Sequence, residues 1–155
     1  LLIVTVTFSR ESVRAHLAQA VKPRILMSET QRALVVDDIP SNRLIAEAML
    51  KQLGWSVLLA ADGREALRVL ESNVLDLVLL DISMPGMSGM EVCQKIRENR
   101  ALVDLPVIAY TAHAQPEDRR SFIASGFNDV LIKPVSRDTL ANAVAAVMQI
   151  GRAHV

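Results

Sequence analysis

Short apolar runs and longer amphipathic stretches alternate along the chain from Ala33 onward. The apolar runs predict strands at residues 33–36, 56–60, 75–80, 107–110 and 129–132. The amphipathic stretches predict helices at residues 42–53, directly after Asp62, at residues 90–98, between Pro116 and Gly126, and at residues 137–149. A strand followed by a helix, five times over, predicts an α/β domain whose right-handed crossovers build a parallel sheet covered by helices on both faces.

Capping signals indicate where these helices begin and end. Ser41 is the expected N-cap of the first helix, and Gly54 follows its end. Asp62 and Glu65 have the spacing of a capping box, and Ser136 is the expected cap of the last helix. The first helix is expected to turn one apolar face toward the core, made of Leu44, Ile45, Ala48, Met49 and Leu53.

Four of the five predicted strands end in polar side chains, which are Asp37 and Asp38, Asp81, Tyr110 and Thr111, and Lys133. In a sheet of this kind, ligands bind at the carboxyl ends of the strands. Any one of these residues alone is more often a turn former or a helix cap than a ligand. Their joint occurrence at the strand ends of one series favours a functional site.

Three carboxylates at one sheet edge repel one another and raise each other's pKa unless a cation shares the site. Oxygen ligands with open positions suit Mg²⁺. The ammonium of Lys133 and the hydroxyl of Thr111 add donors for an anion, so the group can position a phosphoryl group for in-line transfer. A carboxylate can itself be the nucleophile and form an aspartyl phosphate. The strand ends therefore predict phosphoryl chemistry that depends on Mg²⁺.

Four stretches carry a resemblance to a known family: LVVDD at residues 34–38, LLDISMPGMSG at 79–89, PVIAYTA at 106–112 and GFNDVLIKP at 126–134. Over residues 32–148 the chain resembles the receiver domains of two-component response regulators and hybrid histidine kinases. The resemblance implies a flavodoxin-like, doubly wound, five-stranded parallel sheet with strand order 2-1-3-4-5. It leaves open whether the chain is a stand-alone regulator or the receiver of a hybrid kinase.

The resemblance also implies roles for the acidic residues. Asp81 would accept a phosphoryl group from the phosphohistidine of a histidine kinase or a histidine phosphotransfer protein. Asp38 would bind Mg²⁺ directly, Asp37 would help through water, and the backbone carbonyl of Ser83 would complete the protein's share of the metal ligands. The domain would be a signalling module that assists its own phosphorylation and dephosphorylation rather than an enzyme.

The remaining implied roles concern the conformational switch. Lys133 would contact the phosphoryl oxygens, and its peptide bond to Pro134 would be cis. Thr111 would turn inward to hydrogen-bond the phosphoryl group and so shift the population between two states. The family commonly has an aromatic residue three positions before the lysine, where this chain has Val130. We therefore expect the output to be carried by the loop after the fourth strand and by the fourth helix.

Two residues near the strand ends are candidates for a kinetic role. Ser83 lies two positions after Asp81, and His113 lies two positions after Thr111. In such domains these positions flank the path of the attacking water, so they are candidates to set the lifetime of the acyl phosphate. The alternative is that both are solvated loop residues.

The charge balance divides the chain into parts. The 17 basic and 17 acidic residues cancel overall, but residues 33–149 hold 11 basic and 15 acidic residues and carry a charge of −4. We expect residues 32–149 to form the receiver domain and residues 1–31 to be an upstream segment or linker, either not native before Met27 or the tail of a preceding domain. Residues 150–155 are expected to be a non-native tail.

An acidic domain with one cysteine and no long apolar stretch has no basic footprint for nucleic acid and no membrane span, and the single cysteine fits a reducing compartment. We therefore expect a cytoplasmic domain that binds neither nucleic acid nor membrane directly. Two other functions fit less well. A metal-dependent aspartyl-phosphate hydrolase needs a second acid two residues after the nucleophile, where Ser83 stands. A flavodoxin-like FMN-binding module needs a phosphate loop where the chain has Asp37-Asp-Ile-Pro40.

Overall fold

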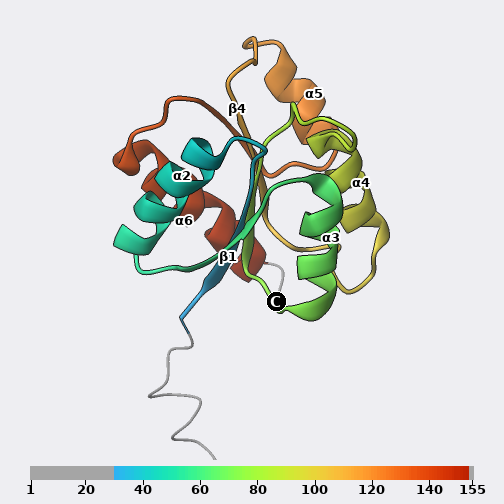
Figure 1. Ribbon diagram of the computed structural model, residues 1–155, viewed down its shortest axis with the longest axis horizontal. Helices are drawn as coiled ribbons and strands as arrows, with labels where there is room; N and C mark the ends of the chain where they lie inside the picture. The colour runs from blue at the N-terminus through green and yellow to red at the C-terminus, as the bar shows by residue number, and fades with distance from the viewer. Residues whose placement is uncertain (1–29, 154–155) are drawn as a thin grey trace, which may run out of the picture. The chain divides into compact units, whose positions relative to one another are not determined.

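The computed structural model describes residues 30–153, which form alternating strands and helices (Figure 1). The strands are β1 (Arg32–Val36), β2 (Ser56–Ala60), β3 (Leu77–Leu80), β4 (Val107–Thr111) and β5 (Asp129–Ile132). The helices are α2 (Pro40–Gln52), α3 (Gly63–Ser72), α4 (Gly89–Glu98), α5 (Asp118–Ala124) and α6 (Arg137–Ala153). All strand pairs are parallel, in the order β2-β1-β3-β4-β5. The predicted fold class and strand order are confirmed.

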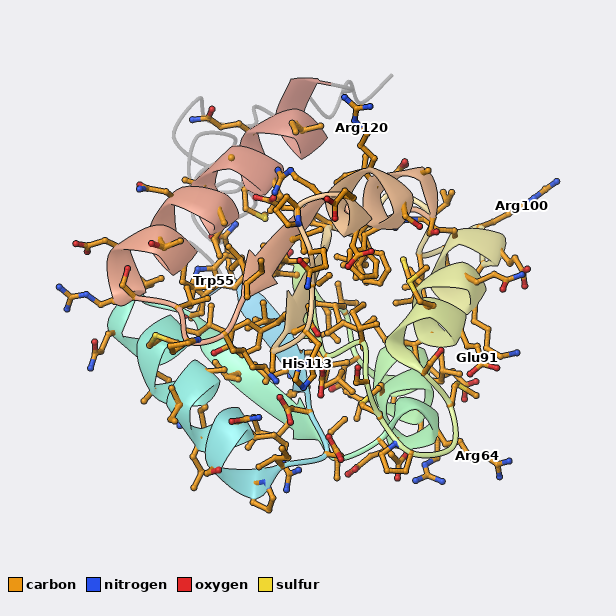
Figure 2. The ribbon with its side chains drawn as sticks, turned by 90° about the horizontal axis from the view of Figure 1, so that it is seen from above. Trp55, Arg64, Glu91, Arg100, His113 and Arg120 are labelled. Atoms are coloured by element: carbon orange, nitrogen blue, oxygen red, sulfur yellow. The ribbon has the colours of Figure 1, made fainter. Side chains whose placement is uncertain are left out.

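Helices cover both faces of the sheet, with α2 and α6 on one side and α3, α4 and α5 on the other (Figure 1). β3, at the centre, is buried at all four positions, Leu77 to Leu80, because both of its faces are covered. Trp55 belongs to the core cluster on the side of α2 and α6 (Figure 2). Two apolar clusters therefore sandwich the sheet and hold its strand ends in fixed positions.

The prediction for the buried face of α2 is wrong. Leu44 and Ile45 are 60% and 54% exposed, and Ala48 is exposed as well, whereas Ala46 and Leu50 are fully buried. Apolar residues occur on more than one side of this helix, so spacing alone did not identify the stripe that packs. Met49 and Leu53, the other members of the predicted face, are half-buried against the core.

The ends of α2 also differ from expectation. The helix begins at Pro40 with Ile39 as its N-cap, so Ser41 lies inside the first turn instead of capping it. Proline at the first helical position has its φ already set for a helix and lacks an N–H that would need a partner there. The proline, rather than the serine, therefore marks the start.

Other boundaries shift by a few residues. β3 begins two residues later than predicted, and α5 begins at Asp118, after Pro116 instead of around it. The cap predictions for Asp62 and Ser136 hold, because their side chains accept hydrogen bonds from the backbone N–H groups of Glu65 and Thr139. Glu65 in turn accepts from the backbone of Ala61, so the expected reciprocal box is shifted by one residue.

The predicted domain limits of 1–31, 32–149 and 150–155 stay predictions. Residues 1–29, 154 and 155 lie outside the described part of the chain. The backbone of α6 runs on to Ala153, past the predicted end of the last helix at residue 149. Within residues 30–153, no helix combines the length and the apolar character needed to cross a membrane.

Candidate functional site

Three carboxylates meet at the carboxyl ends of β1 and β3. One oxygen from each of Asp37, Asp38 and Asp81 can be chosen so that all lie within 4.8 Å of one another. Asp37 is fully buried, Asp81 is 5% exposed and Asp38 is half-buried. Such a group of hard oxygen donors, closed on one side and open to solvent on the other, fits Mg²⁺.

The parallel register of β1 and β3 brings these residues together. Val36 pairs with Leu80, so the residues that follow the two strands emerge side by side. The backbone N–H of Asp81 then donates to the carbonyl of Val36 at 2.9 Å. The carboxylates therefore meet because β1 and β3 end at paired residues and each strand is followed directly by acidic residues.

Gly89, at the start of α4, is a site residue for which sequence reasoning assigned no role. A Cβ at this position would lie 2.1 Å from the backbone carbonyl oxygen of Asp81 and 2.8 Å from the Cα of Ile82. The backbone N–H of Gly89 also donates to the carbonyl of Ile82 at 3.0 Å. Only glycine therefore lets α4 approach the segment that carries Asp81.

Lys133 reaches the carboxylates from the end of β5. Its ammonium forms a salt bridge with Asp37 and lies 3.8 Å from Oδ2 of Asp81, and its side chain is only 12% exposed. The backbone N–H of Lys133 donates to the carbonyl of Thr111 at 2.8 Å, which ties the end of β5 to that of β4. The peptide bond between Lys133 and Pro134 is cis. One cation thus faces two buried carboxylates.

Asp37 is held by the start of α2 as well as by Lys133. Its Oδ1 accepts hydrogen bonds from the backbone N–H of Ile39 at 2.9 Å and from the side-chain amide of Asn42 at 3.4 Å. Its backbone carbonyl accepts one from the guanidinium of Arg43 at 2.7 Å. These bonds fix the orientation of Asp37, and Asn42 and Arg43 join the site as supporting residues that the sequence did not assign to it.

Burial and neighbouring negative charge together disfavour the ionised form of Asp81. Burial raises the pKa of Asp81 above its ordinary value, and Asp37 and Asp38 add to this rise. Lys133 and the backbone N–H of Ser83, which donates to Oδ1 at 3.3 Å, lower the pKa without offsetting the rise. A divalent cation among the three carboxylates would remove this repulsion. The residues present therefore fit the predicted metal.

The predicted switch residues lie on β4 and β5. Thr111 is fully buried, and its hydroxyl accepts a hydrogen bond from the backbone N–H of His113 at 3.2 Å. His113 is exposed and lies near the middle of the view that looks down on the strand ends (Figure 2). Val130 is buried in the same core cluster as Phe122 of α5.

Tyr110, the residue before Thr111, touches the site from the sheet side. Tyr110 is 4% exposed, and the ammonium of Lys133 lies 4.8 Å from its ring centroid. Burial raises the pKa of the Tyr110 hydroxyl above its ordinary value, and the nearby charge of Asp37 raises it further. The sequence placed Tyr110 at a strand end but carried no signal that its ring would face the lysine.

Comparison with known proteins agrees with this geometry. The model of the response regulator receiver domain family matches residues 33–145. The chain belongs to this family. Its receiver domain is similar to part of the sensor histidine kinase GacS of Pseudomonas protegens, with 36% identity over 85% of this chain and 16% of that protein. It is also similar to part of the CAI-1 autoinducer sensor kinase/phosphatase CqsS of Vibrio cholerae, with 38% identity over 94% of this chain and 21% of that protein.

Solved receiver structures share the fold of this domain. The receiver domain of a sensor histidine kinase from Pseudomonas aeruginosa, with a magnesium ion coordinated in its active site cleft, matches with a TM-score of 0.71 and 36% identity, over 77% of this chain and 98% of that one. The chemotaxis protein CheY4 of Vibrio cholerae matches with a TM-score of 0.72 and 31% identity, over 76% of this chain and 98% of that one. The chain is therefore a receiver domain of the two-component phosphorelay type, and it spans about a fifth or less of the two curated relatives named above.

Proposed function

We propose that this receiver domain accepts a phosphoryl group on Asp81 from the phosphohistidine of a histidine kinase or a histidine phosphotransfer protein. The observation that carries the proposal is the position of the Asp81 carboxylate, which is buried between two further carboxylates and the ammonium of Lys133. This arrangement supplies a nucleophile, oxygen ligands for a cation and a positive charge for the phosphoryl oxygens within one group of contacts.

Asp38, Asp81 and the backbone carbonyl of Ser83 would hold Mg²⁺, with Asp37 helping through water. The bound ion would neutralise the negative charge that collects on the phosphoryl group during transfer. The meeting of three carboxylates supports this assignment, because like charges at one place repel one another unless a cation lies among them. A magnesium ion in the cleft of the Pseudomonas aeruginosa receiver domain supports it as well.

The transfer itself is an in-line displacement. A carboxylate oxygen of Asp81 forms a bond to phosphorus while the bond between phosphorus and the histidine nitrogen breaks, and the electron pair of that bond returns to the imidazole. Lys133 lies 3.8 Å from Asp81, so its ammonium has only a short distance to move from Asp37 toward the phosphoryl oxygens. The gain in negative charge on Asp81 supplies the driving force for that movement.

The new phosphoryl group would then draw the hydroxyl of Thr111 away from the backbone of His113. Movement of this hydroxyl would reshape the loop between β4 and α5. Val130 has no large ring to rotate, so the output would be carried by the loop and by α5. Ser83 and His113 would flank the path of the attacking water and set the lifetime of the phosphoryl group.

The partner would dock beside the site, on α2. Ile39, Leu44 and Ile45 leave large apolar side chains exposed, by 49%, 60% and 54%. These residues belong to the segment that begins directly after Asp37 and Asp38, so a helix bundle packed on them would bring a phosphohistidine near Asp81. The sensor kinases among the relatives support a histidine kinase as the source of the phosphoryl group.

The test uses the full chain, a small-molecule acyl phosphate donor and Mg²⁺, with intact mass as the readout. We expect a gain of one phosphoryl group, which does not form when a chelator is present from the start and is absent in Asp81→Asn. The matched control is Asp104→Asn, since Asp104 is an exposed acid before β4, at the opposite edge of the sheet. No gain in the unaltered chain, or an equal gain in Asp81→Asn, would overturn the proposal.

A further inference from the structure

The ring of Tyr110 and the carboxylates of the site hold the ammonium of Lys133 from different directions. The ammonium lies over the ring, 4.8 Å from its centroid, and at the same time pairs with Asp37 and approaches Asp81. A cation within about 6 Å of a ring centroid is attracted by the electron-rich face of the ring. Because Tyr110 is 4% exposed and the lysine side chain 12% exposed, little water screens this attraction.

We propose that Tyr110 is a positioning residue, whose ring keeps the Lys133 ammonium at the site while the lysine moves from Asp37 to the phosphoryl oxygens. This inference rests on the proposed function. A lysine side chain has four flexible bonds, and ordering it costs conformational entropy. An ion pair with Asp37 holds the ammonium at one point. The face of the Tyr110 ring attracts the ammonium at many positions, so the ammonium can move a short distance without losing this contact.

The position of Tyr110 in the sheet excludes a role as the missing aromatic switch residue. Ala109 pairs with Val130, and Tyr110 pairs with Leu131, so Tyr110 and Val130 occupy opposite faces of the sheet. Tyr110 packs in the cluster covered by α2 and α6, and Val130 in the cluster covered by α3, α4 and α5. The ring of Tyr110 therefore cannot fill the space behind Thr111 and acts on Lys133 instead.

Two substitutions of Tyr110 distinguish the effect of its aromatic face from the effects of its hydroxyl and of its size. Tyr110→Phe keeps the aromatic face and removes the hydroxyl, whereas Tyr110→Leu keeps an apolar side chain without an aromatic face. Phe122→Leu is the matched control, because it removes a buried ring from the core cluster on the other side of the sheet. Thermal denaturation identifies variants that do not fold, and Tyr110→Met replaces Tyr110→Leu if the latter fails.

The first measurement is the rate constant of phosphorylation of the full chain by a small acyl phosphate at saturating Mg²⁺. We expect Tyr110→Leu to slow phosphorylation about three- to tenfold, the range that a partly desolvated cation–π contact supports, and Tyr110→Phe and Phe122→Leu to stay within about twofold of the unaltered chain. A rate unchanged in Tyr110→Leu, or an equal loss in Tyr110→Phe or Phe122→Leu, would overturn the inference.

The second measurement is the proton NMR shift of the terminal methylene of Lys133, which does not depend on phosphorylation. An aromatic ring below the ammonium shifts these protons upfield, so we expect the shift in the unaltered chain and in Tyr110→Phe and its loss in Tyr110→Leu. If the unaltered chain takes up no phosphoryl group, the proposed function fails and the positioning role with it. If phosphorylation occurs without the upfield shift, only the inference about Tyr110 fails.

Discussion

The domain contains charged side chains at two places in its core, and they are stabilised in different ways. At the carboxyl edge of the sheet, Asp37 and Asp81 share one ammonium, from Lys133, and the pKa of Asp81 stays raised. Away from that edge, the half-buried guanidinium of Arg97 on α4 is hydrogen-bonded to neutral oxygens, and the charge of Asp104 acts on it as well. It donates to the backbone carbonyls of Gly126, Val103 and Leu105 and to the side-chain oxygen of Asn128, at 2.7–3.1 Å.

The difference separates a structural charge from a functional one. Burial lowers the pKa of Arg97, but its donors meet four oxygen acceptors and the nearby charge of Asp104 opposes the fall, so the guanidinium is satisfied within the protein. The carboxylates at the other place have an excess of like charge, which a bound cation or protonation would relieve. A charge that is satisfied by hydrogen-bond partners within the protein serves to join elements, whereas an excess of like charge marks a place where a cation can bind.

The largest expected effect comes from breaking the structural charge. Arg97→Met would leave carbonyls that accept from Arg97 without a donor, and we expect it to lower the free energy of unfolding by about 3 kcal/mol. Denaturant unfolding measures this change. The control is Lys95→Met, an exposed position on the same helix, which should change stability by less than about 0.5 kcal/mol. Equal stability of the two variants would contradict a structural role for Arg97.

The next largest change in stability should come from adding Mg²⁺, which would bind at the carboxylates on the carboxyl edge of the sheet. A ligand that binds only the folded state at a concentration one hundredfold above its dissociation constant adds about 2.7 kcal/mol of stability. We expect a stabilisation of this size for the unaltered chain and for Asp104→Asn, followed by thermal denaturation across a Mg²⁺ titration. Asp38→Asn should lose most of it. An equal response in Asp38→Asn would remove Asp38 from the metal ligands.

Removal of the excess charge should stabilise the metal-free domain. Without Mg²⁺, we expect Asp81→Asn to raise the free energy of unfolding at neutral pH by about 1 kcal/mol, a common size for substitutions that relieve strain at a functional site. Because the folded pKa of Asp81 is raised above 3.8, the folded state binds the proton more tightly than the unfolded chain. Stability is therefore lost as pH rises through the folded pKa.

Measurements at lower pH check the predicted direction of this change in stability. With a chelator present, the advantage of Asp81→Asn over the unaltered chain should shrink as pH falls from neutral toward 4, since protonation removes the same charge that the substitution removes. Urea denaturation at several pH values measures both proteins. If the advantage of Asp81→Asn instead grew on acidification, the ionised carboxylate of Asp81 would stabilise the folded state, which contradicts this prediction.

The smallest expected effect concerns Cys93, which lies one helical turn before Arg97. The thiol is fully buried, and burial raises its pKa even though the charge of Arg97 lowers it. Alkylation at pH 8 should therefore be at least about tenfold slower in the folded chain than in the denatured chain. It should become faster in Arg97→Met, because that variant opens more often. Rapid labelling of the folded, unaltered chain would show that the helix does not protect the thiol.

The sequence predicted those features that follow from order along the chain. Alternating apolar and amphipathic stretches were enough for the parallel sheet, and acidic residues directly after β1 and β3 were enough to bring Asp37, Asp38 and Asp81 together. These features depend on backbone topology, which local patterns specify well.

Features that depend on how side chains meet across elements were not predicted. The core stripe of α2 was misassigned, because its apolar residues lie on more than one face and only packing decides between them. The contact of Tyr110 with Lys133 joins two neighbouring strands and depends on the direction of a flexible side chain. The close approach of Gly89 to Asp81 depends on where α4 begins in space.

Mapping of the phosphoryl group to a single residue tests the central claim most directly. Borohydride reduces an aspartyl phosphate to an alcohol, which marks the acceptor permanently before digestion and peptide mass spectrometry. After incubation with an acyl phosphate donor and Mg²⁺, we predict that the reduced residue is Asp81, with Asp37 and Asp38 unchanged. Reduction at Asp37 or Asp38, or at none of the three, would contradict the account.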